Sequence, residues 1–340
     1  MDIYSWLQRD DSFHLIQMTP DLVKTMENNE RLIFKSRDRD SSIFLCSDSK
    51  TFHIRKKNHS NTVIVLKHDK ENAKAIGFAS MDSELEPKVV SGSIDISDVP
   101  LFEETGEEFT DFVKRTNPPS FADLRAVSTA SKTEFDVQWA ELNGCEIDGH
   151  AVILGFNLVV SVLKTIITTL VAYDMDQEAF SATKLQERLE DIRPEFARTV
   201  LAQFATKTPA GYSLDKPKIS RWFGLQVLRS TLAPVKEEDF LINWKDAFPA
   251  FFDVSIDIQS LVGSFVRPFP NMVQFYNSAG LPQDPVQRFK ELFKIQASWS
   301  LEEMKPYVED LNSRNLKLES FVMKYARRKR IGKNYVITRR

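Results

Sequence analysis

Hydrophobic and polar positions along the first third of the chain follow the pattern of short strands. Runs rich in β-branched and aromatic residues are separated by polar clusters, which is typical of strands joined by tight turns. The runs cover residues 13–18, 32–35, 43–46, 51–55 and 62–66, with further candidates at 76–79 and 88–96. This pattern predicts a small β-barrel or sandwich over residues 1–96. The region is small for a core of its own, so we expect it to complete its sheet with a partner chain.

The periodicity of hydrophobic residues becomes helical from residue 120. Ser131-Lys132-Thr133-Glu134 is a capping box, which predicts the start of a helix. Residues 145–154 form a hairpin pattern with Asp148-Gly149 at the turn. Helix, helix and hairpin in this order are typical of a winged helix. We therefore predict an α+β chain with tandem winged helices after the β domain, the first over 118–175 and the second, with extra helices, over 176–277.

The last segment, residues 283–340, predicts a third winged helix. Asp284-Pro285 is a good helix start, and Ser300-Leu301-Glu302-Glu303 is another capping box. A third helix is expected over 316–326, followed by a short turn that enters a strand at 331–337.

The charge of the chain is concentrated at its end. The net charge is −3, so contact with nucleic acid requires a local basic patch. Residues 321–340 contain eight lysines and arginines and no acidic residue. Such a cluster on a helix and hairpin predicts contact with DNA phosphates, without sequence specificity. The residues that we expect to make this contact are Lys324, Arg327, Arg328, Lys329, Arg330 and Lys333.

Residues 82–111 are the acidic counterpart of this tail. They hold ten acidic residues and one lysine. A solvated linker is the expected structure, and we assign residues 97–117 to it; the alternative is a DNA mimic that shields the basic tail.

Several chemistries find no support in the sequence. The two cysteines, Cys46 and Cys145, are far apart with apolar neighbours, which indicates core residues and a reducing compartment. The five histidines lack the spacing of metal ligands, so no metal site is predicted. No phosphate-binding or dinucleotide glycine loop is present, so we expect neither a cofactor nor an enzyme.

Three blocks of residues carry a resemblance to a known family, and they lie in the β domain, the first winged helix and the last one. They are Leu45-Cys46-Ser47, Lys50-Thr51-Phe52, Ile54-Arg55, Ser60-Asn61 and Val63-Ile64-Val65; Glu134, Leu142, Ile147, Gly149 and Ile153-Leu154; and Asp284-Pro285, Arg288-Phe289, Leu292-Phe293, Trp299, Pro306-Tyr307, Asp310-Leu311, Lys324-Tyr325 and Arg339-Arg340. With these residues the chain resembles the Dcc family, the cohesion-establishment subunits of the alternative, Ctf-type clamp loader.

The resemblance implies a non-catalytic subunit of a replication factor C variant in the nucleus. In such a subunit the β domain pairs with the large and small Ctf subunits. The winged helices bind single- and double-stranded DNA and the catalytic subunit of DNA polymerase epsilon, in support of sliding-clamp loading and sister-chromatid cohesion. We expect the first winged helix to face the polymerase, although the sequence names no partner-binding residue. The alternative interpretation is a free-standing winged-helix transcription regulator.

Overall fold

The computed structural model describes residues 2–8, 13–38, 42–69, 74–103, 108–312, 316–331 and 334–340. Contacts divide the chain into two compact units, residues 1–161 with 193–203, and residues 162–192 with 204–340. The described residues form a mixed α and β fold with five small sheets and twelve α-helices. The finer division into the five predicted segments stays a prediction.

The N-terminal sheet is open, so of the predicted small β-barrel or sandwich the described residues form a sheet and no closed barrel. Its strand order is β1-β6-β5-β4-β3, and β2 pairs with β6 off this path. The strands β1 and β3 at the two ends do not pair with each other, which leaves the sheet unclosed. The strands are β1 (Asp2–Gln8), β2 (Leu15–Ile16), β3 (Ile33–Lys35), β4 (Ile43–Cys46), β5 (Thr51–Asp69) and β6 (Lys74–Val90).

Two of these strands are much longer than the sequence pattern predicted. Residues 51–55 and 62–66 belong to one strand, β5, and the register of its pairing with β6 shifts between Asn58 and Val63. The acidic residues of 82–90 lie in β6 rather than in solvated chain, because they pair across the sheet with the cations of β5. Lys57 contacts Glu84 and Arg55 contacts Glu86, each at 3.0 Å.

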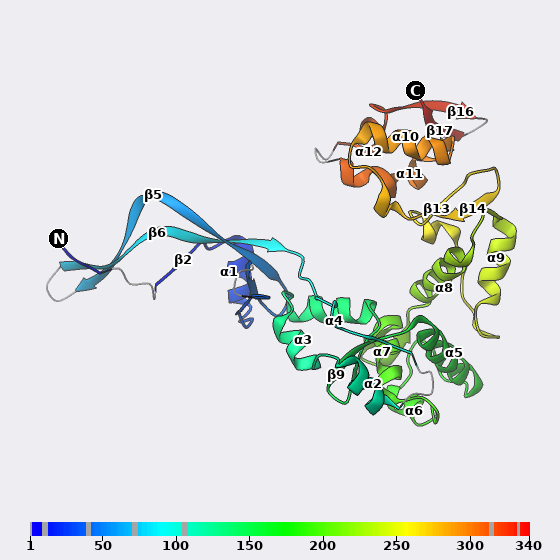
Figure 1. The fold of residues 1–340 in the computed structure, drawn as a ribbon, viewed down its shortest axis with the longest axis horizontal. Helices are drawn as coiled ribbons and strands as arrows, with labels where there is room; N and C mark the ends of the chain where they lie inside the picture. The colour runs from blue at the N-terminus through cyan, green and yellow to red at the C-terminus, as the bar shows by residue number, and fades with distance from the viewer. Residues whose placement is uncertain are drawn as a thin grey trace. The chain divides into compact units, whose positions relative to one another are not determined.

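The sequence pattern also missed a helix in this region, α1 (Pro20–Glu27). Thr19 caps it by accepting a hydrogen bond from the amide of Leu22, and Pro20 occupies the first helical position. Leu22 is buried against Leu45 and Phe52 of the sheet. The helix therefore covers one end of the sheet, while in Figure 1 the described elements beside the far half of the β5–β6 ribbon are β1 and β2.

Beyond the sheet, one order of elements recurs along the chain: a helix, a short strand or bridge, two helices and a hairpin. We refer to these groups as modules. In the first module, residue 120 pairs with residue 150, and Asp148 and Gly149 both have positive φ, which confirms the predicted turn. The first module contains α2 (Phe109–Thr116), α3 (Phe121–Val127), α4 (Lys132–Glu141), β8 (Gly144–Ile147) and β9 (His150–Leu154).

The other modules follow in the same order along the chain. The second contains α5 (Phe156–Ala172), α6 (Ala182–Gln186), α7 (Pro194–Phe204), β10 (Ala205–Thr208) and β11 (Gly211–Leu214). The third contains α8 (Lys216–Ser230), β12 (Val235–Lys236), α9 (Glu237–Asp246), the 3-10 turn η1 (Ile258–Leu261), β13 (Phe265–Val266) and β14 (Met272–Phe275). The fourth contains α10 (Pro285–Ile295), β15 (Ser298–Trp299), α11 (Leu301–Val308), η3 (Glu309–Leu311), α12 (Leu318–Val322), β16 (Ala326–Ile331) and β17 (Asn334–Arg339). The sequence analysis predicted three winged helices with other bounds, and the described residues contain this order of elements four times.

The stretch expected as a linker, residues 97–117, contains structure of its own. The strand β7 (Leu101–Phe102) pairs in parallel with β9, and α2 follows it. Phe102 is buried and packs against Phe109 and Phe112 of α2, with ring centroids 5.6 and 5.0 Å away. These aromatic contacts give the stretch a small core that its acidic composition conceals.

Polar contacts join the N-terminal sheet to the first module. The Nζ atom of Lys35 donates to the carbonyls of Arg125, Ser128 and Ala130 at the end of α3, each at 3.1 Å. The carboxylate of Glu134, at the start of α4, accepts hydrogen bonds from the amide of Gly92 at 3.0 Å and from the hydroxyl of Thr51 at 2.5 Å. The sheet and the first module are therefore one body within their unit.

Candidate nucleic-acid and partner interfaces

The fourth module is positioned by its helix caps and by one buried cation. Asp284 accepts from the amide of Gln287 at 2.9 Å, which confirms the predicted start of α10. Arg288 is buried and makes two hydrogen bonds to the Asp310 carboxylate, at 2.6 and 2.7 Å. It also donates to the carbonyls of residues 282 and 307. Such a satisfied pair fixes the angle between α10 and η3.

The hairpin of the fourth module places its cations on two faces. Residues 328 and 330 of β16 lie opposite residues 337 and 335 of β17. Side chains alternate across a strand, so Arg328 and Arg330 share the face of the buried Ala326 and Ile337. Arg327 and Lys329 lie on the opposite face.

The structure thus separates the cations that the sequence grouped together. Lys324 is exposed in the turn after α12, and Lys333 lies outside the described residues. The helix α12 ends at Val322, earlier than the predicted 326.

Arg328 has two partners inside the module. Its guanidinium lies 2.7 Å from the carboxylate of Glu319 on α12 and 3.7 Å from the ring centroid of Tyr335 on β17. Tyr335 is 52% exposed. The sequence analysis did not single out Tyr335; its signal was an aromatic residue inside a run of cations at the predicted hairpin.

The β5–β6 ribbon is the second candidate interface, because it exposes apolar side chains. Val63 and Ile64 are adjacent on β5 and point to opposite faces, yet they are 38% and 45% exposed. Leu66 on β5 and Ile76 on β6 are exposed as well. Ala79 and Met81 of β6 are buried, whereas these side chains of β5 and β6 stay exposed. Exposed apolar side chains gathered on one part of a sheet are typical of a surface that binds another chain.

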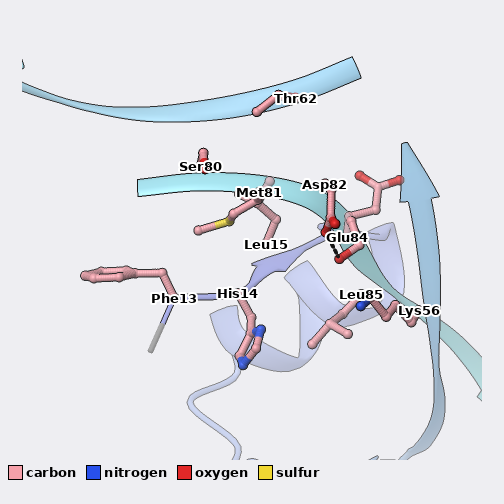
Figure 2. A pocket seen from close by; sticks show the side chains of 11 residues that line it. Phe13, His14, Leu15, Lys56, Thr62, Ser80, Met81, Asp82, Glu84 and Leu85 are labelled. Atoms are coloured by element: carbon pink, nitrogen blue, oxygen red, sulfur yellow. Dashed lines mark hydrogen bonds between the residues drawn. The ribbon is translucent and has the colours of Figure 1, made fainter. Parts of the chain in front are cut away.

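A hollow of about 350 Å³ lies beside this ribbon. Figure 2 shows Phe13 and Leu15 on one side of it and Met81, Asp82 and Glu84 of β6 on the other. Phe13 makes an edge-on contact with Phe78, with ring centroids 5.3 Å apart. The side chain of Glu84 is held by Lys57, which lowers the pKa of its carboxyl below the ordinary value through a hydrogen bond. The residues around the hollow thus contact other residues of the same sheet.

The first module has a different surface from the fourth. Its residues 109–155 include seven acidic and four basic side chains. On α4, Asp136 and Glu141 are exposed, and Val137 between them is 52% exposed. An acidic and apolar helix face repels phosphate and suits contact with a protein.

Most aromatic residues of the third module are buried or half-buried. Phe223, Phe240, Trp244 and Phe252 are buried, and the indole of Trp244 donates to the carbonyl of residue 220 at 2.9 Å. Phe251 and Phe269 are exceptions, since they are 92% and 59% exposed, and Phe251 also has a positive φ of 62°.

Both cysteines are buried and free. Burial raises the pKa of the Cys145 thiol to about 11 and also raises the pKa of Cys46 above its ordinary value. Across the described ranges of the chain, no three histidine, cysteine, aspartate or glutamate side chains gather as a metal site would require. No helix among those residues has the length and apolar character needed to cross a bilayer.

Comparison with known proteins matches the chain to one family. The family model "Sister chromatid cohesion protein Dcc1" matches residues 13–308. The chain is 33% identical to the sister chromatid cohesion protein DCC1 of Saccharomyces cerevisiae, and the match covers 100% of both chains. It is 25% identical to a probable cohesion protein of the same name from Dictyostelium discoideum, over 97% of this chain and 95% of the relative. Identity to the human DCC1 protein is 22%, over 92% of this chain and 85% of the relative. The chain therefore belongs to the Dcc1 family of sister chromatid cohesion proteins.

Proposed function

We propose that this protein is a non-catalytic subunit of the alternative, Ctf-type replication factor C clamp loader. The observation that carries the proposal is the β5–β6 ribbon, whose two faces expose Val63, Ile64 and Leu66. An open sheet with exposed apolar side chains gains stability when partner chains cover those side chains and add strands at its edges. We assign the large and small Ctf subunits as those partners.

The four modules are winged helices in this proposal. Their support is the sheet order, in which the short strand pairs with the last strand of the hairpin. The third module has the order β12-β14-β13 and the fourth has β15-β17-β16. In the first module the bridge between residues 120 and 150 occupies the same place.

The fourth module binds the DNA phosphates without reading sequence, in both single- and double-stranded DNA. Its cations are Lys324, Arg327, Arg328, Lys329, Arg330 and Lys333. The short helix α12 has five residues, which leaves little room for base-reading side chains in the major groove. This disfavours the alternative of a free-standing transcription regulator.

The first module binds a protein rather than DNA, and the catalytic subunit of polymerase epsilon is the partner that we assign to it. The acidic and apolar face of α4, with Asp136, Val137 and Glu141, supports this assignment. Cohesion of sister chromatids takes place on chromosomes, so we place the protein in the nucleus.

Gel filtration tests the assembly. The full chain expressed alone should elute as a polydisperse or aggregated species. The same chain expressed together with the two Ctf subunits should elute with them as one complex. A chain that stays monodisperse alone and elutes apart from the two subunits would refute the proposal.

A further inference from the structure

We propose that Tyr335 and Arg328 form a stacking site for an unpaired nucleobase, so that the hairpin of the fourth module recognises the junction between duplex and single-stranded DNA. This inference rests on the proposed DNA contact and adds a ligand to it. It begins from the two faces of the hairpin, which carry different chemistry.

One face is suited to phosphate. Arg327 and Lys329 are exposed on it and lie beside Thr338 and Val336 of β17. Neither neighbour is charged, so the face presents two cations to solvent. Cations of this kind hold the sugar–phosphate backbone and are indifferent to base pairing.

The other face is suited to a base. Tyr335 is 52% exposed although its module has a large buried core. One side of the ring is covered by the Arg328 guanidinium at 3.7 Å, and Glu319 holds that guanidinium in place at 2.7 Å. A tyrosine ring backed by a fixed cation is preorganised, so little conformational entropy is lost when a base stacks on it. Bases inside a duplex have no free face, so the ligand must be an unpaired base.

The test uses the full chain and two labelled DNAs, a blunt duplex and the same duplex with a single-stranded poly-dT tail. Stacking of one base on an aromatic ring changes affinity about 5-fold to 150-fold. Tyr335→Leu should lose about that factor on the tailed DNA and keep its affinity for the blunt duplex. Tyr335→Phe should keep both affinities, because the ring remains. Lys329→Gln should lower the affinity for both DNAs by the same factor.

A fluorescent base analogue at the first unpaired position gives an independent measurement. Its emission should be quenched by the wild-type chain and by Tyr335→Phe, and not by Tyr335→Leu. Circular dichroism of each variant checks that the module is folded.

The outcomes separate this inference from the DNA contact itself. The stacking site is refuted if folded Tyr335→Leu binds both DNAs as tightly as the wild type does, or loses the same factor of affinity for both. The phosphate contact survives either result. If the wild-type chain binds neither DNA, the proposed DNA contact fails and the stacking site fails with it.

Discussion

The joint between the N-terminal sheet and the first module depends on Glu134, and its removal is the most informative perturbation of the fold. The carboxylate accepts from the amides of Gly92 and Ser131, at 3.0 and 3.1 Å, and from the hydroxyl of Thr51. Glu134→Ala removes the reciprocal half of the capping box and two contacts between segments that are 42 and 83 residues apart. The three donors lie in different places: Ser131 caps α4, Thr51 is in β5, and Gly92 follows β6. Each of them loses a hydrogen-bond acceptor in this variant.

The magnitude follows from these three hydrogen bonds. Each is worth about 0.5–1.5 kcal/mol, and the loss of a cap costs about 1 kcal/mol, so we expect a loss of roughly 2–4 kcal/mol in local stability. The pKa of Glu134 gives the sign of the pH dependence. Burial alone would raise this pKa, but the hydrogen bonds from Thr51, Gly92 and Ser131 hold it below the ordinary value of 4.5. The stabilisation is therefore complete above pH 4.5 and is lost as the pH falls through the lower folded-state pKa.

Hydrogen exchange of the Gly92 and Ser131 amides measures the effect. A local loss of about 2–4 kcal/mol should speed their exchange about 30-fold to 1000-fold in Glu134→Ala. The matched control is Glu141→Ala, on the exposed face of the same helix, which should leave both amides protected. Equal exchange in the two variants would refute the reasoning, because the joint would then not depend on the Glu134 carboxylate.

Three further predictions follow from other contacts. Arg267 forms ion pairs with both Glu237 and Glu303, and Arg267→Met removes the cation that they share. This change should lower the free energy of unfolding of the unit by about 1–3 kcal/mol, less than for a fully buried pair because 22% of the Arg267 side chain is exposed. An unchanged melting temperature would show that these ion pairs do not stabilise the unit. The Cys145 thiol, with its pKa raised to about 11 by burial, should react with iodoacetamide only after unfolding, and labelling of the native chain at the rate of a free thiol would show that it is accessible. DNA affinity should fall with salt at a log–log slope of about −4 to −5, and Lys329→Gln should reduce that slope by about 1; an identical slope would remove Lys329 from the phosphate contact.

Local signals in the sequence predicted local structure well. The caps at Asp284 and Ser131 and the turn at Asp148-Gly149 each depend on residues within a few positions of one another, and the structure confirms them. The length of β5 could not be predicted, because a register irregularity after Asn58 interrupts the alternation that marks a strand. The helix α1 had a readable start at Thr19, but its short span was hidden between strand patterns.

The features that could not be predicted from the sequence depend on contacts between segments that are far apart in the chain. Lys35 reaches carbonyls 90 or more residues away, and nothing in its neighbourhood in the chain indicates that target. The basic tail was visible as a charge cluster, but the division of its cations between two faces required the pairing of β16 with β17. The same pairing explains why Tyr335, a single aromatic residue in the sequence, lies against Arg328.

The most direct test of the central claim is the affinity of the full chain for the co-purified large and small Ctf subunits. This affinity is compared between the wild type and a variant with two new carboxylates at exposed apolar positions of β5. Ile64→Asp with Leu66→Asp places carboxylates on exposed apolar positions, where the free chain tolerates them and a buried interface does not. The account predicts tight binding of the wild-type chain, at least a 100-fold loss in the double variant at about 2.7 kcal/mol or more, and unchanged binding in the Glu141→Ala control. Wild-type affinity in the double variant would show that the ribbon is not the assembly surface.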